Sequence, residues 1–185
     1  LIALISPVES GDGNYFFISG ALILGGGIGL LVSTRVIMTK MPEMVSLFNG
    51  LGGACALLIS IAELLNFHYL ETFELASYLT TLLALLIGSI AFSGSLVAYG
   101  KLSGKIKDSW KLPRANMINM GLLLTLIGIS FYQLQTLESM ELVILIAILS
   151  LLYGITFVLN VGGADMPVII SILNALTGVS AALAG

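Results

Sequence analysis

The run SYLTTLLALLIGSIAFSGSLVAY, at residues 77–99, decides the fold because it is uncharged and largely apolar throughout. A transmembrane helix needs ~20 apolar residues that each rise ~1.5 Å, so this run is long enough to cross a bilayer. Its apolar residues are continuous rather than alternating, and the chain has no closed-barrel turn pattern, which disfavours strands. The run therefore predicts one membrane-spanning helix.

Apolar segments of similar length lie on both sides of this run. The predicted spans are Tyr15–Thr34, Met44–Leu64, Ser77–Tyr99, Ala115–Leu134, Glu141–Leu159 and Met166–Gly185, and residues 1–6 resemble the tail of an earlier span. Only 9% of the residues are charged, against ~25% in soluble domains, so the chain cannot cover a soluble surface. We expect an all-α, polytopic transmembrane helix bundle that forms a single domain over residues 1–185. Because the chain opens on Leu1 without a signal peptide, we expect a fragment of a longer membrane protein.

The charged loops alternate in sign along the chain. Arg35 and Lys40 share one loop, and the remaining basic residues lie in the loop at residues 101–114. Cytoplasmic loops are enriched in Lys and Arg, so we predict that both basic loops face the cytoplasm. The other loops hold only the acids Glu9, Asp12, Glu63, Glu71, Glu74, Glu138 and Glu141, and are predicted to face outward.

Composition also excludes several classes of function. The formal net charge of −3 argues against a nucleic-acid partner, and the single cysteine, Cys55, excludes a disulfide within the chain. The glycine runs at residues 25–29 and 50–53 lack the G-x-G-x-x-G spacing and follow no strand, so they do not predict a dinucleotide loop. Small residues in spans instead favour close helix packing. We expect no metal site and no bound cofactor.

One segment recurs within the chain. Residues 41–53 (MPEMVSLFNGLGG) align without gaps on residues 166–178 (MPVIISILNALTG), at a constant offset of 125 residues. Each copy starts a span from the predicted cytoplasmic side, with Pro in its first turn, where a missing N–H costs nothing. The two copies therefore predict a parallel internal repeat, related by an axis along the membrane normal.

Each copy carries an Asn seven residues after its Pro, about 10 Å into the span. A buried Asn in lipid is costly unless its amide finds partners. Asn49 and Asn174 therefore admit two interpretations: separate hydrogen bonds between helices, worth ~0.6 kcal/mol each, or one shared polar pathway. Because the two copies place Asn at the same depth, the shared pathway remains one of the two interpretations.

The predicted spans lack a titratable side chain near their middle. Glu63 and His68 lie at or beyond the outer end of their span. Proteins that move protons usually place a titratable group within the membrane. A switchable proton carrier would therefore have to come from elsewhere.

Three motifs carry a resemblance to a known family: residues 40–45 with Asn49-Gly50, residues 92–102, and residues 162–168 with residues 172–174. Together they resemble the membrane domain of the β subunit of proton-translocating NAD(P) transhydrogenase, in order and over nearly the whole chain. The resemblance implies a Si-Re-specific enzyme that couples hydride transfer between NADH and NADP⁺ to proton movement across a bacterial inner membrane.

The resemblance also implies partners and a division of labour. An α subunit binds NAD(H) and adds membrane helices, a C-terminal domain of the β subunit binds NADP(H), and the whole complex is a dimer in the bilayer. On this basis the fragment binds no nucleotide and holds no catalytic residue. The resemblance implies that the fragment provides the proton path and couples that path to the NADP(H) domain.

The family's functional residues carry over to four positions. Asn49 stands where some members have a His thought to carry the proton, so we expect that His on an α-subunit helix. Asn174 and Ser95 match an Asn and a Ser near the same path, and Asp165 matches an Asp linked to coupling. Two of these positions also have a plainer interpretation: Asp165 can simply cap the helix that follows, and Ser95 can bond back to its own helix.

Two other functions remain open on the sequence alone. A small secondary transporter could hold a substrate or ion at Asn49 and Asn174 in mid-membrane. A membrane scaffold would only anchor soluble domains. A nucleotide-binding domain in the full gene would favour the transhydrogenase.

Overall fold

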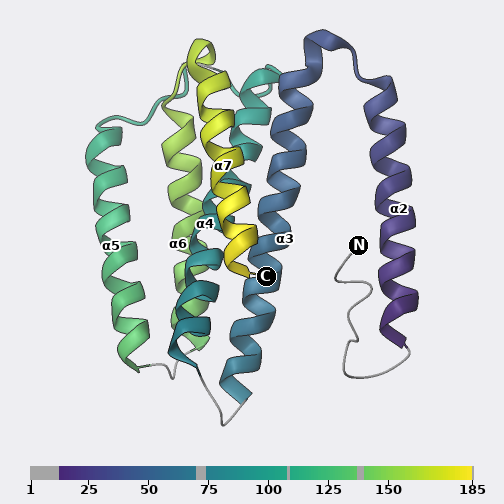
Figure 1. Ribbon diagram of the computed structural model, residues 1–185. Coiled ribbons are helices and arrows are strands. Elements are labelled where there is room, and N and C mark those ends of the chain that lie inside the picture. The colour runs from purple at the N-terminus through teal and green to yellow at the C-terminus, as the bar shows by residue number, and fades with distance from the viewer. Residues whose placement is uncertain (1–12, 70–73, 108, 137–139, 185) are drawn as a thin grey trace. The chain divides into compact units, whose positions relative to one another are not determined.

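A computed structural model describes residues 13–69, 74–107, 109–136 and 140–184, and the described chain is helical without strands (Figure 1). Six helices are long and apolar enough to cross a membrane, which confirms the predicted fold class. The helices are α2 (Gly13–Arg35), α3 (Met41–Tyr69), α4 (Leu75–Leu102), α5 (Ala115–Thr136), α6 (Met140–Leu159) and α7 (Met166–Ala184), with short 3₁₀ turns η1 (Met38–Lys40) and η2 (Gly163–Asp165). The expected tail of an earlier span, at residues 1–6, lies outside the described residues.

The chain divides into two compact units, residues 1–41 and residues 42–185. The first unit holds α2 and η1. The second unit holds nearly all of α3 and the helices α4 to α7, and it contains every candidate site residue named above.

Helix α4 is the central element of the second unit. It packs against α6 and α7, and α3 lies along it, while α5 packs against α6. About two thirds of its most apolar window is buried, a larger share than in any other described span. Small and polar residues of α4, such as Gly88, Ala91 and Ser95, are buried in its contacts with its neighbours.

Small residues set how closely α3 approaches α4. A Cβ added at Gly53 would lie 2.7 Å from the backbone nitrogen of Phe92 and 2.9 Å from the carbonyl oxygen of Gly88. A Cβ at Gly88 would in turn lie 3.1 Å from the backbone nitrogen of Leu57. Neither position has room for a side chain, so the two backbones meet directly, as small residues allow in lipid.

The C-terminal end of α6 is held by groups from α4 and from the loop after α4. Helix ends leave carbonyl groups without partners inside the helix. The buried Lys101 ammonium donates to the carbonyl oxygens of Leu159 at 2.5 Å and Val161 at 2.6 Å. The backbone N–H of Leu112 donates to Asn160 Oδ1 at 2.8 Å. A cation at a helix C-terminus is also favoured by the helix dipole, so these contacts fix the turn between α6 and α7.

The predicted repeat is visible in the backbone. The turns η1 and η2 are three residues each and are offset by 125 positions, as are the starts of α3 and α7. The residues before the turns, Ile37 and Gly162, have φ/ψ of −77°/143° and −71°/156°. Met41 and Met166 have −55°/−45° and −56°/−39°. The same local entry into a helix is therefore built twice.

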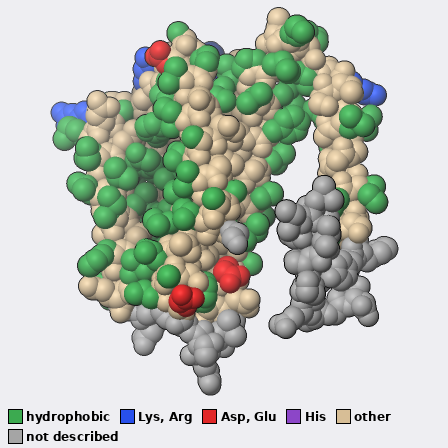
Figure 2. All heavy atoms as spheres, viewed as in Figure 1, with side chains coloured by type: hydrophobic (Ala, Val, Ile, Leu, Met, Phe, Trp, Pro, Cys, Tyr) green, Lys and Arg blue, Asp and Glu red, His purple; other side chains and the backbone are tan. Residues whose placement is uncertain are grey.

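Charge in the second unit follows the predicted topology. The described Lys and Arg residues of this unit lie at the end where α4 and α6 finish and where α5 and α7 begin. Figure 2 shows basic side chains and acidic side chains at this end, and only acidic ones on the visible face at the opposite end. The end with the basic loop is thus the predicted cytoplasmic end of the unit.

Candidate functional site

A buried polar cluster joins α3 to α4. Asn49 Nδ2 donates to Ser95 Oγ at 2.9 Å, and Ser46 Oγ donates to the carbonyl oxygen of Ser95 at 2.8 Å. Asn49 is 7% exposed, Ser46 1% and Ser95 0%. Ser46 and Asn49 are three residues apart and therefore share one face of α3. Two of the predicted site residues, Asn49 and Ser95, are thus in direct contact.

The close approach of the two backbones positions this cluster. Gly50 lies beside Asn49, and a Cβ added there would lie 3.3 Å from Ser95 Cβ. Gly53 follows one turn later and meets the backbone of Phe92, three residues before Ser95. A bulkier residue at either glycine would hold α3 too far from α4 for the short Asn and Ser side chains to meet.

The cluster leaves one strong acceptor without a partner. Asn49 Oδ1 is buried and forms no hydrogen bond with any described residue. An unpaired buried amide oxygen costs ~1–3 kcal/mol, so native proteins normally supply a donor. This oxygen is therefore the position at which a donor from water or from another helix would bind.

Ser95 differs from the serines that bond within their own helix. The hydroxyls of Ser89, Ser93 and Ser150 each donate to the carbonyl of the residue four positions earlier in their own helix. Such bonds satisfy the donor locally and build no path between helices. Ser95 Oγ instead accepts a hydrogen bond from α3. Ser95 therefore joins α3 to α4, as Gln133 Nε2 joins α5 to α4 by donating to the Tyr78 hydroxyl at 2.7 Å.

The structure does not bring Asn174 into this cluster. Asn174 is exposed on α7 and forms no hydrogen bond with any described residue. It stands one turn before Thr177, whose methyl carbon would lie 3.0 Å from a Cβ at Gly52 of α3. Asn174 thus borders the contact between α3 and α7, at the depth of Asn49 in its own copy of the repeat.

Asp165 lies at the basic end of the unit, in η2. Its backbone N–H donates to the carbonyl of Gly162 at 3.1 Å, and its exposed carboxylate forms no hydrogen bond with any described residue. The expected role as a cap of α7 is therefore not formed by its side chain. The carboxylate is available to a group outside the described chain.

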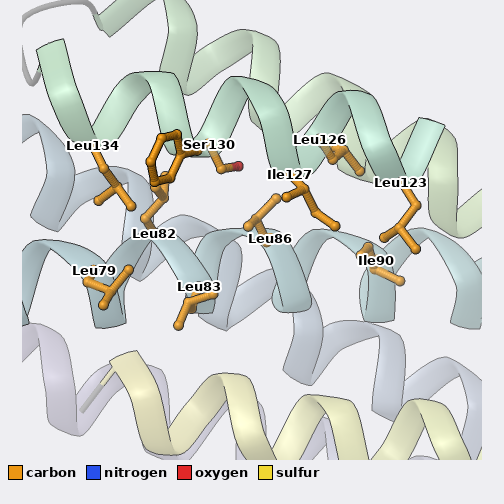
Figure 3. A pocket seen from close by; sticks show the side chains of 11 residues that line it. Leu79, Leu82, Leu83, Leu86, Ile90, Leu123, Leu126, Ile127, Ser130 and Leu134 are labelled. Atoms are coloured by element: carbon orange, nitrogen blue, oxygen red, sulfur yellow. The ribbon is translucent and has the colours of Figure 1, made fainter. Parts of the chain in front are cut away.

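One groove beside α4 is apolar and offers no polar path. It has a volume of about 280 Å³ and lies between the first half of α4 and the second half of α5 (Figure 3). Leucine and isoleucine side chains such as Leu82, Leu86 and Ile127 point into it, and Ser130 supplies the one hydroxyl. Among the described residues, no group of His, Cys, Asp and Glu side chains could hold a metal ion.

Sequence reasoning missed two residues that build the site. Gly53 was taken only as a small packing residue, and its part in bringing Asn49 to Ser95 depends on a tertiary contact. Lys101 is predicted from the sequence as a topology charge and as part of the motif at residues 92–102, without a partner in the fold. Its position on the last turn of an uncharged span was the available signal, because a charge there must find partners or reach the interface.

The fold and the cluster define a polytopic helical membrane protein with an amide and hydroxyl pair buried between its spans. All 185 residues match the family described as NAD(P) transhydrogenase beta subunit. The chain is 34% identical over 187 residues to "NAD(P) transhydrogenase subunit beta" of Rhodospirillum rubrum, and equally to that of its strain ATCC 11170. The match covers 98% of this chain and 40% of each relative, so the chain spans less than half the length of these relatives.

The chain therefore belongs to the NAD(P) transhydrogenase β subunit family, as its motifs indicated. Its six helices, each long and apolar enough to cross a bilayer, make it an integral membrane protein. The secondary transporter and the scaffold are correspondingly disfavoured.

Proposed function

We propose that this chain is the proton-translocating domain of the transhydrogenase, which couples hydride transfer between NADH and NADP⁺ to proton movement across the membrane. The observation that carries the proposal is the buried Asn49–Ser95 pair with its unpaired Asn49 Oδ1. Among the described side chains, those buried near the middle of the spans offer amides and hydroxyls, and a neutral amide cannot load and release a proton by itself. The pair would therefore orient a carrier rather than act as one.

The carrier is a histidine from a membrane helix of the α subunit. Imidazole changes charge between pH 5 and 8, which Asn does not. Its N–H would donate to Asn49 Oδ1, directly or through one water, and so satisfy the unpaired acceptor. Asn174 would approach the same imidazole from α7. In the neutral ring one nitrogen donates and the other accepts, whereas in the protonated ring both donate. The hydrogen bonds between the ring and the two amides would therefore change when the ring is protonated.

Asp165 serves coupling on the cytoplasmic side. Its exposed carboxylate lies on the turn that Lys101 holds against α4, close in sequence to the start of α7. A C-terminal NADP(H)-binding domain of the same subunit would contact this carboxylate. NAD(H) and NADP(H) bind to other domains of a dimeric complex in the bacterial inner membrane, and this chain holds no catalytic residue.

Replacing Asn49 by Leu in the assembled enzyme tests the proposal. The change keeps the volume similar but removes both the donor to Ser95 and the acceptor. We expect proton pumping driven by NADPH and an NAD⁺ analogue to fall about tenfold or more, since ~1.4 kcal/mol lost in the transition state gives a factor of ten. The same loss is expected for Asn174→Leu.

The control separates transport from folding. Leu58 is an exposed residue of α3, and Leu58→Ala should leave the buried pair intact without adding a polar group to the span. The amount of assembled enzyme and its unfolding midpoint are measured for all variants. Undiminished pumping in well-folded Asn49→Leu enzyme would overturn the proposal, as would an α subunit without a His in its membrane helices.

A further inference from the structure

A groove between α5 and α6 opens at the basic end of the second unit and has a volume of about 380 Å³. Asn116 lies in the first turn of α5 and Phe157 in the last turn of α6, where both helices reach that end. The groove therefore begins at the predicted cytoplasmic interface and runs along the two helices into the membrane. Its lining side chains are Asn116, Asn119, Met120, Leu123, Tyr153 and Phe157.

The two walls of this groove differ in chemistry. The rings of Tyr153 and Phe157 stack, with centroids 6.0 Å apart and planes inclined by 17°, so α6 offers a flat aromatic surface. Helix α5 offers amides: Asn116 is exposed, and Asn119 Oδ1 is buried with no hydrogen-bond partner among the described residues. An unpaired buried acceptor requires a donor. The groove therefore suits a molecule with an apolar body and a hydrogen-bond donor near its polar end.

Positive charge lies next to the cytoplasmic end of the groove. Residues 101–114 hold five basic residues against one acid, Asp108. Arg114 directly precedes α5, and Lys111 lies three residues earlier. Both are exposed, and neither side chain forms a hydrogen bond or ion pair with any described residue. Cytoplasmic leaflets carry anionic lipids, and basic pockets between transmembrane helices bind their headgroups. This end of the groove is therefore complementary to an anionic headgroup.

We propose that the groove binds an anionic phospholipid of the cytoplasmic leaflet whose headgroup carries a hydroxyl, as phosphatidylglycerol does. Its phosphate lies beside Arg114 and Lys111, and one acyl chain lies along the stacked rings of α6. A headgroup hydroxyl donates to Asn119 Oδ1, directly or through one water, and so gives the buried acceptor its partner. Phosphatidylethanolamine has the donor without the net charge, and phosphatidylcholine has neither, so the three lipids separate the two contributions.

Native mass spectrometry of the assembled full-length enzyme tests this inference without relying on proton pumping. Delipidated enzyme is titrated with each of the three lipids, matched in their acyl chains, and the bound molecules are counted. We expect saturable binding that is tightest for phosphatidylglycerol, weaker for phosphatidylethanolamine and weakest for phosphatidylcholine. Equal binding of the three lipids, or no retained lipid, would overturn the proposal.

Two arginine variants test the charge. Arg114→Gln should weaken phosphatidylglycerol binding about fivefold, the factor that corresponds to ~1 kcal/mol per basic residue near an anionic surface. Arg35→Gln is the matched control, since it removes the same charge from an exposed position in the other basic loop, and it should leave the binding unchanged. Equal effects of the two variants would contradict a headgroup site at the start of α5.

Two methionine variants and one asparagine variant test the groove itself. Met120 and Met117 are both exposed on α5, but only Met120 lines the groove. Met120→Trp should fill the groove and remove the phosphatidylglycerol, whereas Met117→Trp should retain it; equal binding would show that the lipid lies elsewhere. Asn119→Leu should abolish the preference for phosphatidylethanolamine over phosphatidylcholine, and a surviving preference would contradict the hydrogen bond to Asn119. If Met120→Trp prevents assembly, the arginine pair decides the outcome.

Discussion

Gly53→Ala tests whether the close approach of α3 and α4 holds the polar pair together. The added Cβ would lie 2.7 Å from the backbone nitrogen of Phe92, whereas ordinary contacts begin at 3.4 Å. Backbone atoms cannot swing away as the end of a side chain can, so the helices must separate by about 0.7 Å. The Asn49–Ser95 hydrogen bond lies one turn away. The same separation would lengthen the distance between Asn49 Nδ2 and Ser95 Oγ from 2.9 Å to about 3.6 Å, which is too long for a hydrogen bond.

The energetic cost follows from the same contact. Overpacking a tight interface costs ~1–3 kcal/mol, and losing the hydrogen bond adds ~0.5–1.5 kcal/mol. The greater helix propensity of Ala offsets at most ~1 kcal/mol. We therefore expect a lower unfolding midpoint and a loss of proton pumping that exceeds the loss of assembled protein.

The assay measures the unfolding midpoint of the assembled enzyme and its pumping in vesicles. Gly121→Ala is the matched control, because an added Cβ there meets no atom within 4 Å. It should match the wild type or exceed its stability slightly. If Gly53→Ala retains both the midpoint and the pumping of the wild type, the close approach does not maintain the Asn49–Ser95 bond.

Three further outcomes are expected. Lys101→Met should destabilise the enzyme by ~1–3 kcal/mol for each of the carbonyls of Leu159 and Val161 left unpaired. Lys107→Met, at an exposed lysine of the loop after α4, should not destabilise it. Equal unfolding midpoints of the two variants would refute the role of Lys101 in holding the end of α6. Cysteine at Ser103 should react with an impermeant thiol reagent only from the cytoplasmic side and cysteine at Glu74 only from outside, in a background without Cys55; the reverse pattern would invert the topology. Asp165→Asn should lower coupled turnover while leaving the unfolding midpoint unchanged, because its carboxylate makes no hydrogen bond within the described chain; a large loss of stability would instead indicate a structural role.

Much of the fold was predictable because hydropathy and charge act locally. The uncharged run at residues 77–99 predicted a helix, and the basic loop after it predicted the direction of that helix. The observed helix, Leu75–Leu102, is longer by two residues at its start and three at its end. The repeat was also predictable, since Pro, Ser, Asn and Gly recur at fixed spacing. It appears as two equivalent turns and helix starts.

The environment of the repeated residues was not predictable from the repeat itself. Asn49 and Asn174 have the same position in the repeat, yet one is buried against α4 and the other is exposed. The difference comes from which helix lies opposite, which is a tertiary property. The expectation that both amides share one polar interior stays a prediction, because Asn174 forms no hydrogen bond with any described residue.

A double-mutant cycle on pumping rate tests most directly whether Asn49 and Ser95 act as one unit. Asn49→Ala, Ser95→Ala and the double variant are compared with the wild type in vesicles, with assembled enzyme held equal. Residues joined by a hydrogen bond show a coupling energy of ~0.5–3 kcal/mol, while independent residues add within ~0.3–0.5 kcal/mol. If the pair orients the proton carrier together, the double variant pumps no more slowly than the worse single variant. Strictly additive losses, or two single variants that pump normally, would contradict a joint role of Asn49 and Ser95 in the proton path.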